Sequence, residues 1–142
     1  MEVPTDLLDI TPSGDAWSVT KHWTSRNLKP SFNDFVLHDG HIYGFDGNIF
    51  TCVELKTGNR KWKKGRYGTG QVLLLADQPV LLVLSDQGQA VLVAPNPNAF
   101  EELGQLQALN GKTWNHPALA HGRLYVRNAE EIACYELTPK GP

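Results

Sequence analysis

The chain repeats one pattern of short strands and tight turns three times, with a period of about forty residues. The clearest copy is the stretch DGHIYGFDGNIFTCVELKTGNRKW, which begins at Asp39 and holds two Asp-Gly pairs between short apolar runs. Asp-Gly in that setting predicts β-hairpins, because glycine adopts the positive φ that such turns require. Weaker copies are recognised by their second strands, where Leu82 and Tyr125 align with Tyr43.

A repeat of this length made of four short strands is typical of a β-propeller, whose unit is a four-stranded blade. The three repeats cover residues 32–63, 72–106 and 114–137. The segment FEELGQLQAL, which starts at Phe100, also has a short-helix interpretation, but the repeat favours an outer strand there. We therefore predict an all-β fold: a propeller fragment of about three four-stranded antiparallel blades.

The third repeat ends before an outer strand, whereas an extra strand precedes the first repeat. That extra strand is AWSVTKHW, residues 16–23, in which alternate residues are mainly apolar. We expect it to serve as the outer strand of a blade, as happens where the two ends of a propeller join. Residues 1–15 are expected to form an irregular lead-in, and residues 138–142 a tail.

Three blades do not close a ring, because propellers typically carry four to eight. An open set leaves apolar blade faces exposed, and such surfaces tend to bind partners. The remaining blades are therefore expected either from a longer parent chain or from a second copy. Two copies would form a six-bladed ring in which each N-terminal strand completes the partner's third blade, and two-fold dimers are the commonest oligomers.

Charge and hydropathy exclude two classes of partner. The formal net charge of −2 gives no basic surface for nucleic acid, and the cationic run at residues 60–66 is interpreted as a solvated strand end. No apolar stretch reaches the roughly 18 residues of a transmembrane helix. The N-terminus has neither the basic region nor the apolar core of a signal peptide.

The stretch CVELKTGNRKW, starting at Cys52, resembles the repeat of the pyrroloquinoline-quinone (PQQ)-like propellers. The blade pattern of that family runs Ala-x-Asp-x-x-Thr-Gly-x-x-x-Trp. Thr57, Gly58 and Trp62 match it outright, while Cys52 stands at the Ala position and Glu54 at the Asp position. The resemblance covers roughly residues 16–137 and is strongest in the first repeat.

This resemblance implies a structural role for the matched residues, with Trp62 as a peg that stacks on a neighbouring blade. Cys52 and Cys134 share one repeat position two blades apart, too far for a disulfide, and are expected to be small buried fillers. The chain is most similar to the C-terminal blades of a larger propeller, such as the outer-membrane assembly lipoprotein or a quinoprotein dehydrogenase. A bacterial, extracytoplasmic location in the periplasm or cell envelope follows from that similarity.

Residues that could carry chemistry are few. PQQ enzymes of this family use a calcium site and often a pair of adjacent cysteines, and the sequence has no adjacent cysteines. No cofactor is therefore expected, and PQQ with calcium belongs only to the alternative of a dehydrogenase fragment. His38 and His41 flank a turn, and Asp39 between them is a third possible metal ligand, but a plain hairpin tip is the favoured interpretation.

The most plausible pocket lies where the first strand of each repeat would line the central channel. The candidate pocket residues are Asn33, Asp34, Gln71, Trp114, Asn115 and His116. The competing interpretation is a polar ring around a water-filled channel.

We expect a non-catalytic scaffold or protein-interaction module rather than an enzyme. The alternatives are a fragment of a PQQ-dependent dehydrogenase and a propeller that binds carbohydrate or peptide. In the last case Trp17, Trp23 and Trp114 would act as stacking platforms.

Overall fold

The computed structural model describes residues 3–137, and in that range the chain is all-β with four small antiparallel sheets. One sheet is a hairpin of two long strands, β1 (Thr5–Ser13) and β2 (Ala16–Ser25). The first blade comprises β3 (Val36–His38), β4 (His41–Asp46), β5 (Ile49–Glu54) and β6 (Arg60–Arg66). The second comprises β7 (Gln71–Leu75), β8 (Val80–Leu84), β9 (Gln89–Val93) and β10 (Glu102–Gln107). The third comprises β11 (Ala118–Ala120), β12 (Arg123–Arg127) and β13 (Ile132–Glu136).

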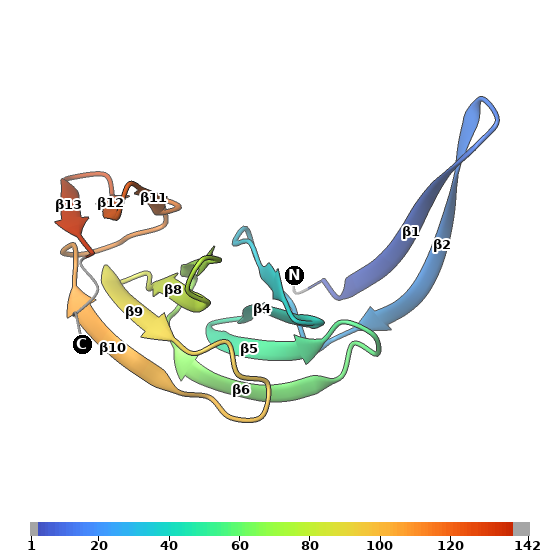
Figure 1. Ribbon diagram of the computed structural model, residues 1–142, viewed down its shortest axis with the longest axis horizontal. Coiled ribbons are helices and arrows are strands. Elements are labelled where there is room, and N and C mark those ends of the chain that lie inside the picture. Colours follow the sequence, from blue (N-terminus) through green and yellow to red (C-terminus); the bar gives the residue numbers. More distant parts are fainter. Residues whose placement is uncertain (1–2, 138–142) are drawn as a thin grey trace.

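Within each blade the strands lie side by side in chain order, as in the blade of a propeller. Figure 1 shows the three blades following one another along an arc, with the β1–β2 hairpin extending from the end occupied by the first blade. The predicted fold class is therefore confirmed as an all-β, propeller-like fragment. No helix in the described range could span a lipid bilayer.

Local turn chemistry explains why the inner strands pair where they do. Asp39 and Gly40 have φ values of 44° and 71°, and His121 and Gly122 have 50° and 71°. Two consecutive residues with positive φ are the mark of a type I′ turn, whose twist matches that of the strands it joins. These turns link β3 to β4 and β11 to β12, as the Asp-Gly and His-Gly pairs predict.

Apolar cores form between successive blades. Aromatic side chains of the first blade pack against aliphatic side chains of the second: Tyr43, Phe45, Phe50 and Trp62 against Val72, Leu81, Val83, Val91 and Val93. The opposite face of the second blade packs on the third, through Leu82, Leu84, Ala90, Leu124 and Val126. Each fully buried side chain of this kind contributes about 1.5–3 kcal/mol.

The number of covered faces explains the residue pattern of each middle strand. β8 lies between two cores, so its sequence VLLVL is apolar throughout. β12 has only one covered face, and its sequence RLYVR alternates between buried Leu124 and Val126 and exposed neighbours. Strands covered on both faces lose the alternation that half-exposed strands keep.

The structure corrects two predictions about the N-terminal region. Residues 1–15 are not an irregular lead-in, since β1 covers Thr5–Ser13. The predicted strand at 16–23 exists as β2, but it pairs with β1 rather than completing a blade of the same chain. The strand that pairs with β2 is formed by TDLLDITPS, a segment whose many polar residues gave no strand signal in the sequence. The strand expected at 100–106 is confirmed as β10, and the predicted tail at 138–142 lies outside the described residues.

The third blade exposes the face that points away from the second. Tyr125 pairs with Cys134 as Tyr43 pairs with Cys52 in the first blade. Tyr43 and Cys52 are completely buried, whereas Tyr125 is 39% exposed and Cys134 is exposed. The prediction that Cys134 is a small buried filler was therefore wrong, because no further sheet formed by residues 3–137 covers its face. Both cysteines are free.

A buried carboxylate joins the segment after the hairpin to the first blade. The side chain of Asp46 is only 2% exposed, and its oxygens lie 2.6 Å from Arg60 Nη2, 2.6 Å from Lys63 Nζ and 3.3 Å from Lys29 Nζ. The Lys29 backbone N–H also donates to the Phe45 carbonyl at 3.1 Å. Burial acts to raise the pKa of Asp46, but the hydrogen bonds and charges of Lys63 and Lys29 outweigh it, so the net pKa is lowered.

Candidate functional site

Segments of all three blades meet at the position predicted for the channel pocket. His116 Nε2 of the third blade lies 3.8 Å from Asp34 Oδ2, at the entry to the first. Gln71 Nε2 of the second blade donates to the Trp114 carbonyl at 3.2 Å. The rings of Phe32 and Trp114 meet edge to face, with centroids 5.5 Å apart. The structure thus brings together residues that lie up to eighty positions apart in the sequence.

Two of the predicted pocket residues are structural. Asn33 and Gln71 are each only 4% exposed, so neither presents much surface to a ligand. Asn33 Oδ1 accepts the Ser31 backbone N–H at 2.9 Å. Within residues 3–137 the Asn33 amide nitrogen has no protein acceptor, which leaves one buried donor at this junction. Gln71 therefore ties the second blade to the third, whereas Asn33 bonds within its own loop, and neither lines an open site.

Trp114 and Asn115 instead border a hollow of about 380 Å³ on the side of the third blade. Its walls are Asn110, Lys112, Trp114, Asn115, Asn128, Ala129 and Glu130. Lys112 Nζ lies 3.7 Å from the centroid of the Trp114 ring, a cation–π contact. The hollow is therefore rich in amides and carries one half-exposed aromatic ring.

Asn128 fixes the wall of this hollow. Its Nδ2 donates to the Asn110 carbonyl at 2.7 Å, and its Oδ1 accepts the backbone N–H groups of Glu130 and Glu131, both at 2.9 Å. Sequence reasoning missed this wall, although the polar run NGKTWN beginning at Asn110 was an available signal. The contact between Asn128 and Asn110 had no local signal, because the two residues lie 18 positions apart.

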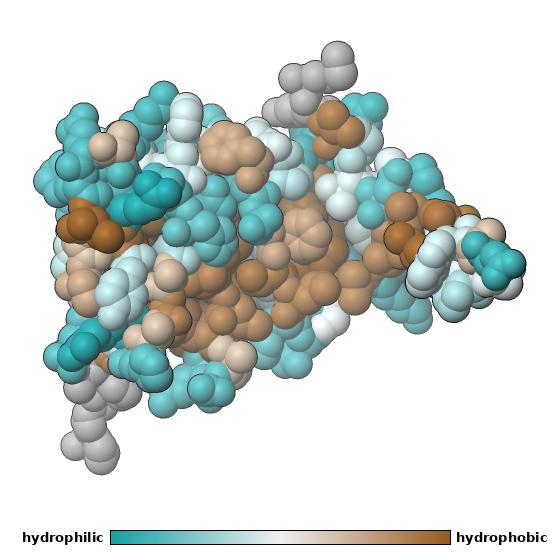
Figure 2. Space-filling model, turned by 90° about the horizontal axis from the view of Figure 1, so that it is seen from above, coloured by the Kyte–Doolittle hydropathy of each residue, from teal (hydrophilic) through white to brown (hydrophobic). Residues whose placement is uncertain are grey.

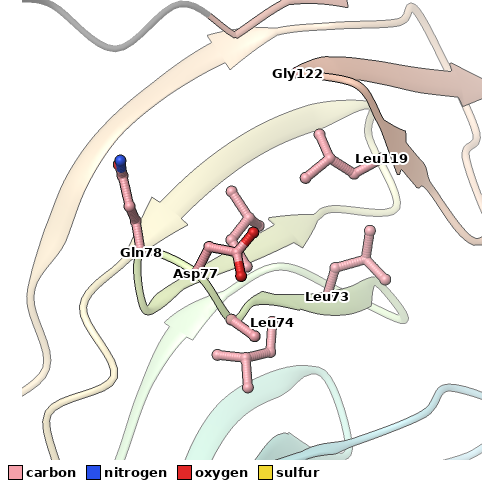
Figure 3. Close-up of a pocket in the computed structure, with 8 residues that line it drawn as sticks. Leu73, Leu74, Asp77, Gln78, Leu119 and Gly122 are labelled. Carbon is pink, nitrogen blue, oxygen red and sulfur yellow. The ribbon is translucent and has the colours of Figure 1, made fainter.

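A second, apolar cavity of about 440 Å³ opens between the second and third blades. It is lined by Leu73, Leu74, Leu75, Ala76, Asp77, Gln78, Leu119 and Gly122. Figure 3 shows Leu119 of the third blade near Leu73 of the second, with Asp77 and Gln78 on the turn after β7. The cavity arises because the short β11 leaves the leucines of β7 only partly covered.

The residues that carry the family resemblance lie at the joint between the first two blades. Trp62 is 8% exposed, and its indole N–H donates to the Asn96 carbonyl of the second blade at 2.8 Å. Its ring meets that of Phe100, also in the second blade, with centroids 5.3 Å apart. Cys52 lies opposite Trp62 on β5, at the centre of the same core.

The Thr-Gly turn between β5 and β6 contacts the base of the β1–β2 hairpin. Thr57 Oγ1 donates to the Glu54 carboxylate, and Gly58 has a φ of 72°. The Gly58 carbonyl accepts the Ser25 hydroxyl at 2.6 Å, and a Cβ at Gly58 would lie 3.0 Å from the Trp23 ring. Glycine is needed here both for its backbone conformation and for the close approach of β2.

The three tryptophans proposed as stacking platforms do not share one surface. Trp23 is half-buried and donates its indole N–H to the Leu55 carbonyl at 3.0 Å, so it anchors β2 to the first blade. Trp17 is 69% exposed near the tip of the hairpin, and Trp114 is 46% exposed beside the amide-rich hollow.

The two histidines of the first blade lie at a hairpin tip. His41 Nδ1 lies 2.7 Å from the Asp39 carbonyl oxygen, and His38 Nε2 lies 3.3 Å from the Asp39 carboxylate. Between residues 3 and 137, no three side chains of the types His, Cys, Asp and Glu gather as a metal site requires.

Neither family models nor curated proteins show a match to the chain. The resemblance to PQQ-like repeats therefore stays a prediction from the sequence.

Proposed function

We propose that the chain is a non-catalytic propeller scaffold whose role is to bind other protein surfaces. The observation that carries this proposal is an exposed apolar stripe on the β1–β2 hairpin. Leu8, Ile10, Trp17 and Val19 lie on one face of it and are 41–69% exposed. Figure 2 shows brown, hydrophobic residues among hydrophilic ones at the right-hand end of the molecule, where Figure 1 places the hairpin.

The stripe has a polar counterpart on the other face of the same hairpin. The cross-strand pairs Ile10–Val19 and Pro12–Trp17 face one way, and the pairs Asp9–Thr20 and Thr11–Ser18 face the other. Such an amphipathic ribbon is the pattern of a strand pair with one buried face. A two-stranded hairpin is at best marginally stable in water, and covering its apolar face supplies the missing stability.

The third blade and the first blade offer further uncovered surface. Tyr125 and Cys134 are exposed on the free face of the third blade, and Leu37 is 52% exposed on the face of the first blade that points away from the second. These faces correspond to the two open ends of the blade series. Copies of this chain, or further blades of a longer chain, are the partners that such ends would accept.

Sedimentation equilibrium tests this proposal with two neighbouring substitutions. The chain mass is 15.8 kDa, so association of two copies gives about 32 kDa. We expect Val19→Asp, on the apolar face, to abolish association, and Ser18→Asp, on the polar face, to leave it unchanged. Equal behaviour of the two variants would show that the stripe is not a binding surface. Dye-linked alcohol oxidation after adding PQQ and calcium would contradict the non-catalytic assignment.

A second candidate function rests on the hollow beside Trp114. Amide side chains hydrogen-bond to hydroxyl groups, and an exposed indole ring packs against the apolar face of a sugar. The hollow combines both, so we propose neutral oligosaccharides as its ligand class. Isothermal titration with such oligosaccharides should give binding that Trp114→Ala removes and Leu103→Ala, on exposed β10, retains. Identical titrations of both variants would exclude this site.

A further inference from the structure

We infer that the β1–β2 hairpin of one copy adds to the free edge of β13 in a second copy, and that the exchange is reciprocal. This inference rests on the proposed function, because it names the partner and the mode of binding for the same apolar stripe. Within residues 3–137, the first and second blades have four strands, the third has three, and the hairpin is a separate pair.

The missing strand belongs at the outer edge of β13. In the first blade β5 has β6 as its outer neighbour, and in the second blade β9 has β10. β13 is the equivalent strand of the third blade, and within the described range nothing pairs with its outer side. An open strand edge presents unpaired N–H and C=O groups and is a template for another strand.

The outer strand of the first blade, β6, shows the side-chain pattern that a strand beside β13 would repeat. Trp62 of β6 lies opposite Cys52 and is buried, whereas its neighbours Lys61 and Lys63 are more exposed. One face of the outer strand is therefore aromatic and the other polar. In the third blade, Cys134 and Tyr125 repeat the cross-strand pair that supports Trp62 in the first.

β2 has the same pattern, with an aromatic side chain on one face and polar side chains on the other, and could form the missing outer strand of the third blade. Trp17 is flanked on the strand by Ala16 and Ser18, and its ring is 69% exposed. Placing Trp17 opposite Cys134 of the second copy reproduces the position of Trp62 opposite Cys52. In an antiparallel pairing with that register, Val19 then lies opposite Ile132, which is 75% exposed in the single chain.

The placement of the hairpin requires a second copy rather than the same chain. Figure 1 shows the hairpin at one end of the arc of blades and β13 at the other, so one chain does not bring them together. Each chain carries one surplus hairpin and one deficient blade. Two copies related by a two-fold axis satisfy both, which is the closed arrangement expected of a homodimer.

A cross-link tests the register directly. In a Cys134→Ser background, Val19→Cys and Ile132→Cys place one thiol on each of the strands that we expect to pair. Opposed residues in antiparallel strands have Cα atoms about 4.5–5.5 Å apart, within the range of about 4.4–6.8 Å that a disulfide needs. Cys52 is completely buried and stays unreactive in the folded chain. Mild oxidation should convert most of the protein to a disulfide-linked dimer.

The matched control is Ser18→Cys with Ile132→Cys in the same background, since Ser18 points to the opposite face of β2. We expect it to yield at least fivefold less dimer at equal protein concentration. Equal yields, a persistent monomer or a ladder of higher oligomers would overturn the reciprocal pairing. If the cross-link fails while the Val19→Asp and Ser18→Asp variants still differ in association, the stripe binds proteins in another way and only the inferred pairing is lost.

Discussion

Replacing Trp62 with alanine removes the side chain that joins the first blade to the second. The ring is 8% exposed and meets Tyr43 and Phe50 of its own blade and Phe100 of the next. A tryptophan buries about 150–250 Å², and Trp→Ala changes in protein cores cost about 3–5 kcal/mol. The substitution also leaves the Asn96 carbonyl without the indole donor, which adds about 1 kcal/mol.

We therefore expect Trp62→Ala to lower the free energy of unfolding by about 4–6 kcal/mol, a large part of the 5–15 kcal/mol of a typical domain. Trp62→Phe keeps the apolar contacts but loses the N–H and part of the ring. It should cost about 1–2 kcal/mol.

Urea unfolding followed by far-ultraviolet circular dichroism, with linear extrapolation to water, measures both values. Leu103→Ala is the control, because Leu103 lies on β10 and is 51% exposed. It should stay within about 0.5 kcal/mol of the unsubstituted chain. A loss below about 1 kcal/mol for Trp62→Ala would show that this ring does not couple the blades.

Three further predictions concern local features of the fold. Asp46→Asn should cost about 2 kcal/mol at pH 7, because it leaves three cations around a neutral amide. Since the pKa of Asp46 is lowered in the folded chain, its stabilisation is present at neutral pH and is lost as pH falls below about 4. Urea melts at pH 7 and pH 3 should therefore differ less for Asp46→Asn than for the unsubstituted chain. Gly88→Ala should destabilise the chain by at least about 2 kcal/mol more than Gly14→Ala in urea melts. Both glycines have positive φ, but only at Gly88 would a Cβ lie 2.2 Å from a backbone oxygen. Equal losses would show that the backbone relaxes freely there. Finally, a thiol reagent at pH 8 should label Cys134 rapidly and Cys52 only in urea, because burial raises the pKa of Cys52 to about 11. Rapid labelling of two thiols in the folded chain would contradict the buried position of Cys52.

Features that depend on neighbouring residues could be predicted from the sequence. The turns at Asp39-Gly40 and His121-Gly122 follow from the need for two consecutive positive φ values. The strands between them follow from short apolar runs, and Trp62 was identified through the resemblance to the PQQ-like blade pattern. All-β architecture and the number of blade-like sheets follow from these local patterns.

Which strand lies beside which, and which faces are covered, depends on contacts between distant segments and could not be predicted from local patterns. β2 pairs with β1 rather than with the third blade, because the two are joined by a tight turn and form a hairpin at little loss of chain entropy. Cys52 and Cys134 stand in equivalent cross-strand pairs, yet one is buried and the other is exposed. The strand pattern at Cys134 carries no information about a neighbouring sheet, since burial depends on what packs against that face from elsewhere.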